Sequence, residues 1–105
     1  MYKISLITGD GIGPELSASA ISVLNTIGEK FDFKFDLTTL SAGDKALEQT
    51  GKALPDETVE IIKKSDVCLK APVGESAADV IVVLRRMLDL YANIRPAKSY
   101  PHMPA

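Results

Sequence analysis

Short apolar runs typical of strands alternate with segments whose apolar residues recur at helical spacing. This alternation limits the fold more than any other feature of the chain. We expect strands over 2–8, 31–40 and 67–74, and helices over 14–29, within 41–51, over 54–66 and over 76–90. Helices between strands favour parallel pairing, because each helix returns the chain across the sheet in a right-handed crossover. The order predicts an α/β protein with a mostly parallel sheet and flanking helices.

Local signals support several of these boundaries. Pro14 suits the first turn of a helix, where its missing N–H has no consequence, and Ser76 is expected to cap the last helix. The run 31–40 alternates apolar and polar residues as a half-exposed strand does, whereas 2–8 and 67–74 are expected to be buried. An extended, proline-rich stretch closes the chain. Because so few strands make a thin sheet, we expect a piece of a longer protein.

Composition excludes several classes of function. The formal charge is −2, which disfavours non-specific nucleic-acid binding because that requires basic patches. No apolar run approaches the roughly 20 residues that cross a bilayer, and the start of the chain is broken by glycine too early for a secretory signal. The single cysteine, Cys68, lies in an apolar run and is expected to be a buried structural thiol. We therefore expect a cytoplasmic protein.

The stretch GDGIGPEL follows the first expected strand and contains Gly9, Gly11 and Gly13. A dinucleotide fingerprint requires G-x-G-x-x-G, and here the third glycine comes too early. Asp10 would repel a pyrophosphate, and Glu15 adds a second negative charge at the start of the helix. The local chemistry therefore favours a tight turn from strand to helix that needs glycine for positive φ or close packing.

Two arginines near the end of the chain could bind a di-acid. Arg85 lies on the last expected helix, with Ile81 and Val82 one turn earlier on a shared face; Arg95 lies beyond that helix. Two converging guanidinium groups could grip two carboxylates beside an apolar patch. In the alternative interpretation, Arg85 pairs with Asp89, the two aliphatic residues are core, and Arg95 is a surface charge.

Two stretches carry a resemblance to a known family. GDGIGPE after a first strand, and the pattern L-R-x-x-L-D-x-Y-A-N-I-R-P-A-K within 69–101, are similar to the β-decarboxylating isocitrate/isopropylmalate dehydrogenases. The resemblance covers essentially the whole chain, but only the N-terminal portion of a family member. It implies a partial domain of the isocitrate/isopropylmalate dehydrogenase-like fold, in which residues 1–105 form the N-terminal part of the first, nucleotide-side domain.

The resemblance also implies a function. It points to oxidative decarboxylation of a 2-hydroxy acid with NAD or NADP and Mg²⁺ or Mn²⁺, in a homodimer. Arg85 and Arg95 would bind the malate-type carboxylates, while Ile81 and Val82 contact the variable substituent. The absence of a serine or asparagine at those two positions favours 3-isopropylmalate, the leucine-biosynthesis substrate, over isocitrate; an isocitrate or homoisocitrate dehydrogenase is the alternative.

By the same resemblance, Ile12, Lys70 and Gly74 would contact the cofactor. The metal ligands and catalytic groups would lie outside this chain, which is expected to be inactive alone. Neither the choice between NAD and NADP nor the natural end of the protein follows from these residues. A hypothesis of another class is a non-catalytic α/β module that binds anions through the arginine helix.

Overall fold

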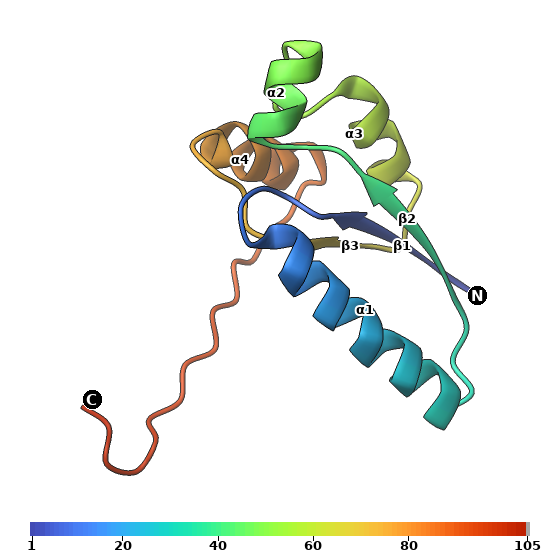
Figure 1. Cartoon of the computed structure of the whole chain (residues 1–105), viewed down its shortest axis with the longest axis vertical. Helices are drawn as coiled ribbons and strands as arrows, with labels where there is room; N and C mark the ends of the chain where they lie inside the picture. The colour runs from blue at the N-terminus through green and yellow to red at the C-terminus, as the bar shows by residue number, and fades with distance from the viewer. Residues whose placement is uncertain (105) are drawn as a thin grey trace.

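The structure is a computed structural model, and it describes residues 1–104. Three parallel strands form a sheet in the order β2-β1-β3, with helices between them (Figure 1). This confirms the predicted α/β class. The elements are β1 (Tyr2–Ile7), α1 (Gly13–Lys30), β2 (Phe35–Leu40), α2 (Asp44–Thr50), α3 (Asp56–Lys63), β3 (Val67–Lys70) and α4 (Ala77–Met87).

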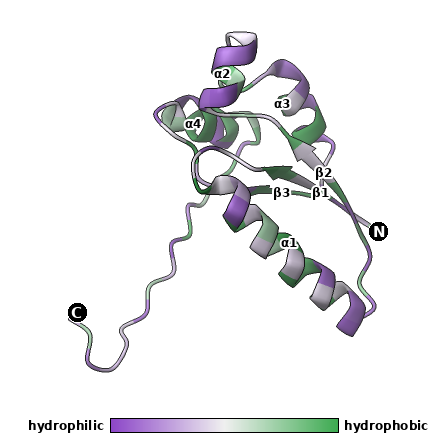
Figure 2. Ribbon diagram, viewed as in Figure 1, coloured by the Kyte–Doolittle hydropathy of each residue, from purple (hydrophilic) through white to green (hydrophobic). Residues whose placement is uncertain are grey.

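The hydrophobic core lies on the face of the sheet that α3 and α4 cover. Ile7 on β1 and Val80 on α4 are fully buried there, and apolar residues gather in β1 and α4 whereas α2 is mostly hydrophilic (Figure 2). Leu6 points to the other face, where it meets residues of α1. Adjacent positions of β1 therefore supply both faces, as the two-residue period of a strand requires.

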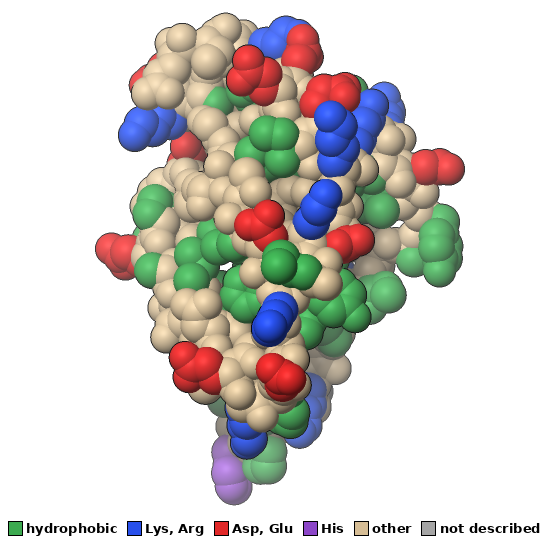
Figure 3. Space-filling model, turned by 90° about the vertical axis from the view of Figure 1, so that its right-hand side faces the viewer, with side chains coloured by type: hydrophobic (Ala, Val, Ile, Leu, Met, Phe, Trp, Pro, Cys, Tyr) green, Lys and Arg blue, Asp and Glu red, His purple; other side chains and the backbone are tan. Residues whose placement is uncertain are grey.

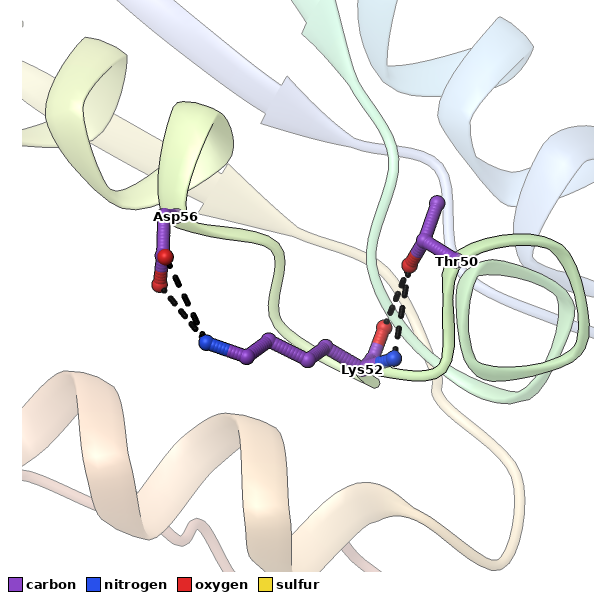
Figure 4. A network of polar contacts seen from close by, with 3 residues as sticks. All are labelled: Thr50, Lys52 and Asp56. Atoms are coloured by element: carbon purple, nitrogen blue, oxygen red, sulfur yellow. Dashed lines mark hydrogen bonds and ion pairs between the residues drawn. The ribbon is translucent and has the colours of Figure 1, made fainter.

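A short polar network connects α2 with α3. The Lys52 ammonium group contacts the Asp56 carboxylate at 3.1 Å, and the Thr50 hydroxyl bonds the backbone of Lys52 (Figure 4). This is the only ion pair in the part of the chain that the structure describes. Both charged side chains are exposed, so the pair contributes little to stability.

The prediction of a strand over 31–40 is wrong in its first four residues, because β2 begins only at Phe35. The chain first closes α1. Asp32 adopts a left-handed backbone with φ 52°, and the N–H of Phe33 donates to the carbonyl of Gly28 at 2.9 Å. This is the hydrogen-bond pattern of a helix C-terminus that turns away from its axis. The alternating pattern of 31–34 therefore belongs to a helix end, not to a strand.

The prediction of a buried strand over 67–74 is also corrected. β3 spans only Val67–Lys70, and its residues alternate between exposed and partly buried. The reason is its place at the edge of the sheet, where only β1 pairs with it among residues 1–104. Cys68 is accordingly half-buried, not fully buried; burial still raises the pKa of its thiol, against the opposing effect of the Lys70 charge.

Helix α1 follows the predicted boundaries closely, but its apolar side is only partly covered. Leu16, Val23 and Ile27 are exposed, and Figure 3 shows apolar side chains at the surface between charged groups. Beyond α4 the chain is exposed from 91 to 104. It is extended over 91–100, as predicted, and runs away from the body of the domain before a turn at 101–103 (Figure 1). No helix within residues 1–104 has the length and apolar character needed to span a membrane.

Candidate functional site

The loops that follow the three strands meet at one edge of the sheet. The carboxyl ends of parallel strands share an edge, and open α/β sheets bind their ligands there. In this chain the loop between β1 and α1 contacts the segment after β3 through a hydrogen bond from the N–H of Asp10 to the carbonyl of Pro72, 2.9 Å. The loop between β2 and α2 joins them through side chains, so the three segments form one site.

Asp10 lies at the centre of this arrangement. Its Oδ2 accepts hydrogen bonds from the N–H of Asp44 at 2.8 Å and of Gly74 at 3.0 Å, and its Oδ1 accepts from the N–H of Lys45 at 3.3 Å. The hydrogen bond from Gly74 is the main cause that holds the pKa of Asp10 below its ordinary value. The carboxylate thus serves as the N-terminal cap of α2, whose own flanking residue, Gly43, has no side chain to do so.

Asp44, like Asp10, accepts hydrogen bonds from another loop, here the segment between β3 and α4. Its carboxylate accepts from the hydroxyl of Ser76 at 2.6 Å, from the N–H of Ser76 at 2.9 Å and from the N–H of Glu75 at 3.1 Å. These bonds, with that of the Ser76 hydroxyl the strongest, lower the pKa of Asp44. The prediction that Ser76 caps α4 is therefore wrong in mechanism. Ser76 stands at the cap position, but its hydroxyl donates to Asp44 and makes no capping bond.

Glycine is required where these segments approach one another. Gly9 and Gly11 have φ of 71° and 58°. A Cβ on Gly9 would overlap the carbonyl oxygen of Pro72, and one on Gly13 would overlap that of Thr8. This confirms the prediction of a tight turn that uses glycine for positive φ and for close packing.

The three residues predicted to contact a cofactor do not form a phosphate site. Gly74 already donates its N–H to Asp10, and carboxylates occupy the starts of both α2 and α4. Ile12 precedes α1 with an exposed side chain, and the Lys70 ammonium group donates to the carbonyl of Ala71 at 3.0 Å. A pyrophosphate therefore does not fit the starts of α2 and α4, and contacts of these residues with a nicotinamide stay a prediction.

Arg85 lies in the last turn of α4 and is partly exposed, and Arg95 is exposed in the extended segment. Neither guanidinium group has a hydrogen bond or ion pair within residues 1–104. The alternative partner, Asp89, instead adopts a left-handed backbone with φ 52° at the end of α4. Its neighbour Leu90 donates its N–H to the carbonyl of Arg85 at 3.0 Å, which completes the helix terminus.

The aliphatic residues beside Arg85 are not core. The buried positions of α4 are Val80 and Leu84, whereas Ile81 is partly buried and Val82 is 41% exposed. The interpretation of both as core residues is therefore wrong for Val82, and this side chain is available for contact. The meeting of Arg85 and Arg95 on one ligand stays a prediction.

A metal ion does not fit the described residues. Within 1–104, no three histidine, cysteine, aspartate or glutamate side chains come together in a group that could hold one. The oxygens of the two neighbouring carboxylates, Asp10 and Asp44, accept hydrogen bonds from backbone N–H and hydroxyl groups. A cation has no hydrogen to donate and could not take the place of these groups. No chemistry is therefore assigned to a metal held by this chain.

The carboxylates of Asp10 and Asp44 are the functional candidates that sequence reasoning missed. Asp10 stands out in the sequence only as an obstacle to a pyrophosphate. Its partners lie 34 and 64 residues away, and no local pattern connects them. The one available signal is an aspartate directly after a glycine at the end of a strand or at the start of a helix, which both residues share.

Comparison with known proteins gives these features a context. The family model described as isocitrate/isopropylmalate dehydrogenase matches residues 3–105. The chain is 54% identical over 99 residues to the 3-isopropylmalate dehydrogenase of Archaeoglobus fulgidus, covering 94% of this chain and 29% of that protein. It is 49% identical over 102 residues to the 3-isopropylmalate dehydrogenase of Saccharolobus solfataricus, covering 97% and 30%.

A further relative is the 3-isopropylmalate/3-methylmalate dehydrogenase of Methanocaldococcus jannaschii, 50% identical over 100 residues, with 95% of this chain and 29% of the relative covered. Among solved structures, isocitrate dehydrogenase from Methylococcus capsulatus superimposes with a TM-score of 0.70 at 40% identity, covering 87% of this chain and 27% of that one. The chain thus spans about 30% of the length of its curated relatives, which confirms the predicted partial domain. With its glycine loop, parallel sheet and arginine helix, this chain belongs to the isocitrate/isopropylmalate dehydrogenase family.

Proposed function

We propose that this chain is part of an NAD- or NADP-dependent enzyme that oxidatively decarboxylates a 2-hydroxy acid, with 3-isopropylmalate as the favoured substrate and leucine biosynthesis as its pathway. The observation that carries this proposal is the identity of 49–54% with 3-isopropylmalate dehydrogenases along nearly the whole chain. Residues 1–105 would form the N-terminal part of the first, nucleotide-side domain.

Arg85 and Arg95 bind the carboxylates of the substrate in this proposal. A guanidinium group binds a carboxylate through two parallel hydrogen bonds, and both groups lack a partner within residues 1–104. A charge that has no internal partner keeps its full capacity for a ligand. Asp89 lies at the terminus of α4 and does not pair with Arg85, so the Arg85 guanidinium group has no partner in the described residues.

Ile81 and Val82 determine the preference for an isopropyl group. Their branched side chains sit one turn before Arg85 on α4, and neither is fully buried in the domain. An apolar substituent gains about 1–3 kcal/mol per matched group in such a pocket. A carboxylate in the same place would lose water without gaining a donor, so isocitrate is disfavoured.

A bound NAD or NADP would supply the hydride acceptor for oxidation of the substrate carbon that bears the hydroxyl. Toward that cofactor the chain offers Ile12 as an exposed apolar contact and Lys70 and Gly74 at the end of β3. Lys70 also lines a hollow of about 180 Å³ between α1 and the edge of β3. The Mg²⁺ or Mn²⁺ ion and the catalytic groups would come from other segments. We further propose a cytoplasmic homodimer.

Two alternatives remain. The likeness to an isocitrate dehydrogenase structure at 40% identity supports isocitrate as an alternative substrate, and homoisocitrate is a further alternative of the same class. A non-catalytic module that binds anions through Arg85 and Arg95 is the alternative of another class. Both alternatives make predictions that differ from those of a 3-isopropylmalate dehydrogenase.

The test is a dehydrogenase assay of the full-length gene product that carries this chain. Each of 3-isopropylmalate, isocitrate and homoisocitrate is offered with NAD or NADP and Mg²⁺ or Mn²⁺. We expect the highest kcat/KM with 3-isopropylmalate, and an Arg85→Lys variant should lose at least about tenfold because a lysine cannot bind both oxygens in parallel. Residues 1–105 alone should show no turnover. Binding of di-acids without turnover by the full-length protein would favour the non-catalytic module.

A further inference from the structure

Asp10 and Asp44 lie in series between the glycine loop and α4, the helix that carries the proposed substrate contacts. We propose that these two carboxylates, the carboxylate relay, are positioning residues for substrate binding. Asp10 fixes the start of α2 and with it Asp44, and Asp44 fixes Glu75 and Ser76, the two residues that lead into α4. This inference rests on the proposed function, because it concerns the place of Arg85.

Neither helix has a cap of its own. The residues that flank the starts of α2 and α4 make no capping hydrogen bond with their side chains. The first N–H groups of a helix have no partner inside it. For α2 the carboxylate of Asp10 supplies acceptors from another loop, and for α4 the carboxylate of Asp44 binds the backbone of the two residues that lead into the helix. Asp10 serves α2 and the N–H of Gly74; Asp44 serves the N–H groups of Glu75 and Ser76. The direction of α4 thus depends on residues distant in sequence.

The relay packs closely against two glycines. A Cβ on Gly43 would overlap the Asp10 carboxylate, and one on Gly74 would overlap that of Asp44. Ser76, which donates to Asp44, is itself buried at 6% exposure. Each carboxylate is therefore enclosed by backbone on the side where it accepts hydrogen bonds. Loss of either one removes the acceptor that joins these loop segments.

A small change at the start of α4 is enlarged at its end. With a rise of 1.5 Å per residue, Arg85 lies about 13 Å along the helix from Ser76. A tilt of α4 by roughly 5° about its start would therefore displace Arg85 by about 1 Å. A misplacement of that size is enough to weaken a positioned contact strongly. Ile81 and Val82, nearer the pivot, move less. The relay should therefore affect carboxylate binding more than the choice of alkyl group.

The experiment compares Asp44→Ala, Asp44→Asn and Asp10→Asn in the full-length protein. We expect Asp44→Ala to raise the KM for 3-isopropylmalate about tenfold, with the KM for the nicotinamide cofactor changed less than about twofold. Asp44→Asn keeps an oxygen that can accept from Ser76, so its KM should lie between those of the wild type and Asp44→Ala. Asp10→Asn keeps its two shorter bonds if its amide oxygen takes the Oδ2 position, and should also be intermediate.

Asp66→Ala is the matched control. The Asp66 carboxylate also accepts a backbone hydrogen bond, from the N–H of Lys3 at 2.8 Å, but at the opposite edge of the sheet, before β3 begins. Its loss should lower thermal stability and leave the KM for 3-isopropylmalate within about twofold of the wild type. An equal rise of KM in Asp66→Ala and Asp44→Ala would overturn the inference, because general loosening would then explain both.

A double-mutant cycle with Arg85→Lys separates positioning from stability. If Asp44 acts through Arg85, Asp44→Ala should raise KM much less in the Arg85→Lys background than in the wild type. Independent, multiplicative effects would overturn the inference. Should Asp44→Ala fail to fold, the cycle is run with Asp44→Asn, for which the same two outcomes apply.

A readout without substrate distinguishes failure of this inference from failure of the proposed function. Absence of turnover by the wild type with every 2-hydroxy acid would refute the proposed function. Amide exchange in the absence of substrate would then decide on the relay. Faster exchange of the N–H groups of 75–80 in the Asp44 variants than in Asp66→Ala supports the relay as the anchor of α4, and unchanged protection overturns it.

Discussion

Replacing the three glycines of the loop after β1 one at a time by alanine separates two reasons for having a glycine. Gly11 has positive φ but open space around its missing Cβ, whereas Gly13 has an ordinary φ but a Cβ position blocked by the carbonyl of Thr8. Gly9 combines positive φ with overlap on the carbonyl of Pro72. The three substitutions therefore sample backbone strain alone, steric overlap alone, and both together.

The expected losses of unfolding free energy follow from these differences. Gly11→Ala should cost about 1–2 kcal/mol, the penalty of a left-handed conformation for an L-residue. Gly13→Ala should cost about 1–3 kcal/mol through overpacking. Gly9→Ala adds both terms and breaks the Asp10–Pro72 backbone hydrogen bond, for a total of about 3–6 kcal/mol, a large share of a typical domain's stability.

Urea denaturation measures these values. Far-ultraviolet circular dichroism is the signal, because the chain has no tryptophan whose fluorescence could report unfolding. Equal m values across the series would show that the variants share one unfolded state. Gly51→Ala is the control, because Gly51 has φ 82° and nothing near its Cβ position. Its loss of unfolding free energy should match that of Gly11→Ala. Equal destabilisation by Gly9→Ala and Gly11→Ala would refute the proposed close approach of the two loops.

Three further predictions concern pH, a buried hydroxyl and a helix end. The pKa values of Asp10 and Asp44 are lowered in the folded chain, so their contribution is complete above the unfolded value near pH 4 and is lost as the pH falls through the lowered values. Urea titrations at a series of acidic pH values should show a shallower decline in Asp10→Asn and Asp44→Asn; an unchanged slope would contradict the hydrogen bonds assigned to the carboxylates. Ser17→Ala should raise the free energy of unfolding by about 1 kcal/mol, because the Ser17 hydroxyl is buried and has no partner within residues 1–104; thermal denaturation checks this, and a loss of stability would reveal a missed partner. At the left-handed Asp89, Asp89→Gly should be more stable in urea than Asp89→Ala by about 1 kcal/mol, since only glycine takes that φ without strain; the reverse order would count against the helix terminus described above.

The order of elements could be predicted from the sequence because apolar periodicity is a local property. The predicted start of β2 was wrong because it depends on the conformation of a single turn. Asp32 ends α1 by adopting a positive φ, and nothing in the alternating residues around it announces this. The prediction that β3 is buried was wrong for another reason. Its exposure follows from its place at the edge of the sheet, which is a property of the topology.

The candidate site divides in the same way. The place of Arg85 and its apolar neighbours on one helix could be predicted because helical periodicity is local; their role as substrate contacts stays a prediction. The roles of Asp10 and Asp44 could not be predicted, because each carboxylate acts on backbone groups of another loop. Backbone N–H groups carry no residue-specific signal, so the sequence cannot mark which ones an acid will find.

The packed glycines and carboxylates divide the domain into a part that can evolve and a part that cannot. A Cβ on Gly9 would overlap a backbone oxygen, and one on Gly43 or Gly74 would overlap the carboxylate of Asp10 or Asp44, so a larger residue at any of them would displace a group of another loop. Ile81 and Val82 are under no such constraint. In the proposed function, these two side chains set the substrate preference, so exchanging them should alter that preference while the loop packing stays unchanged.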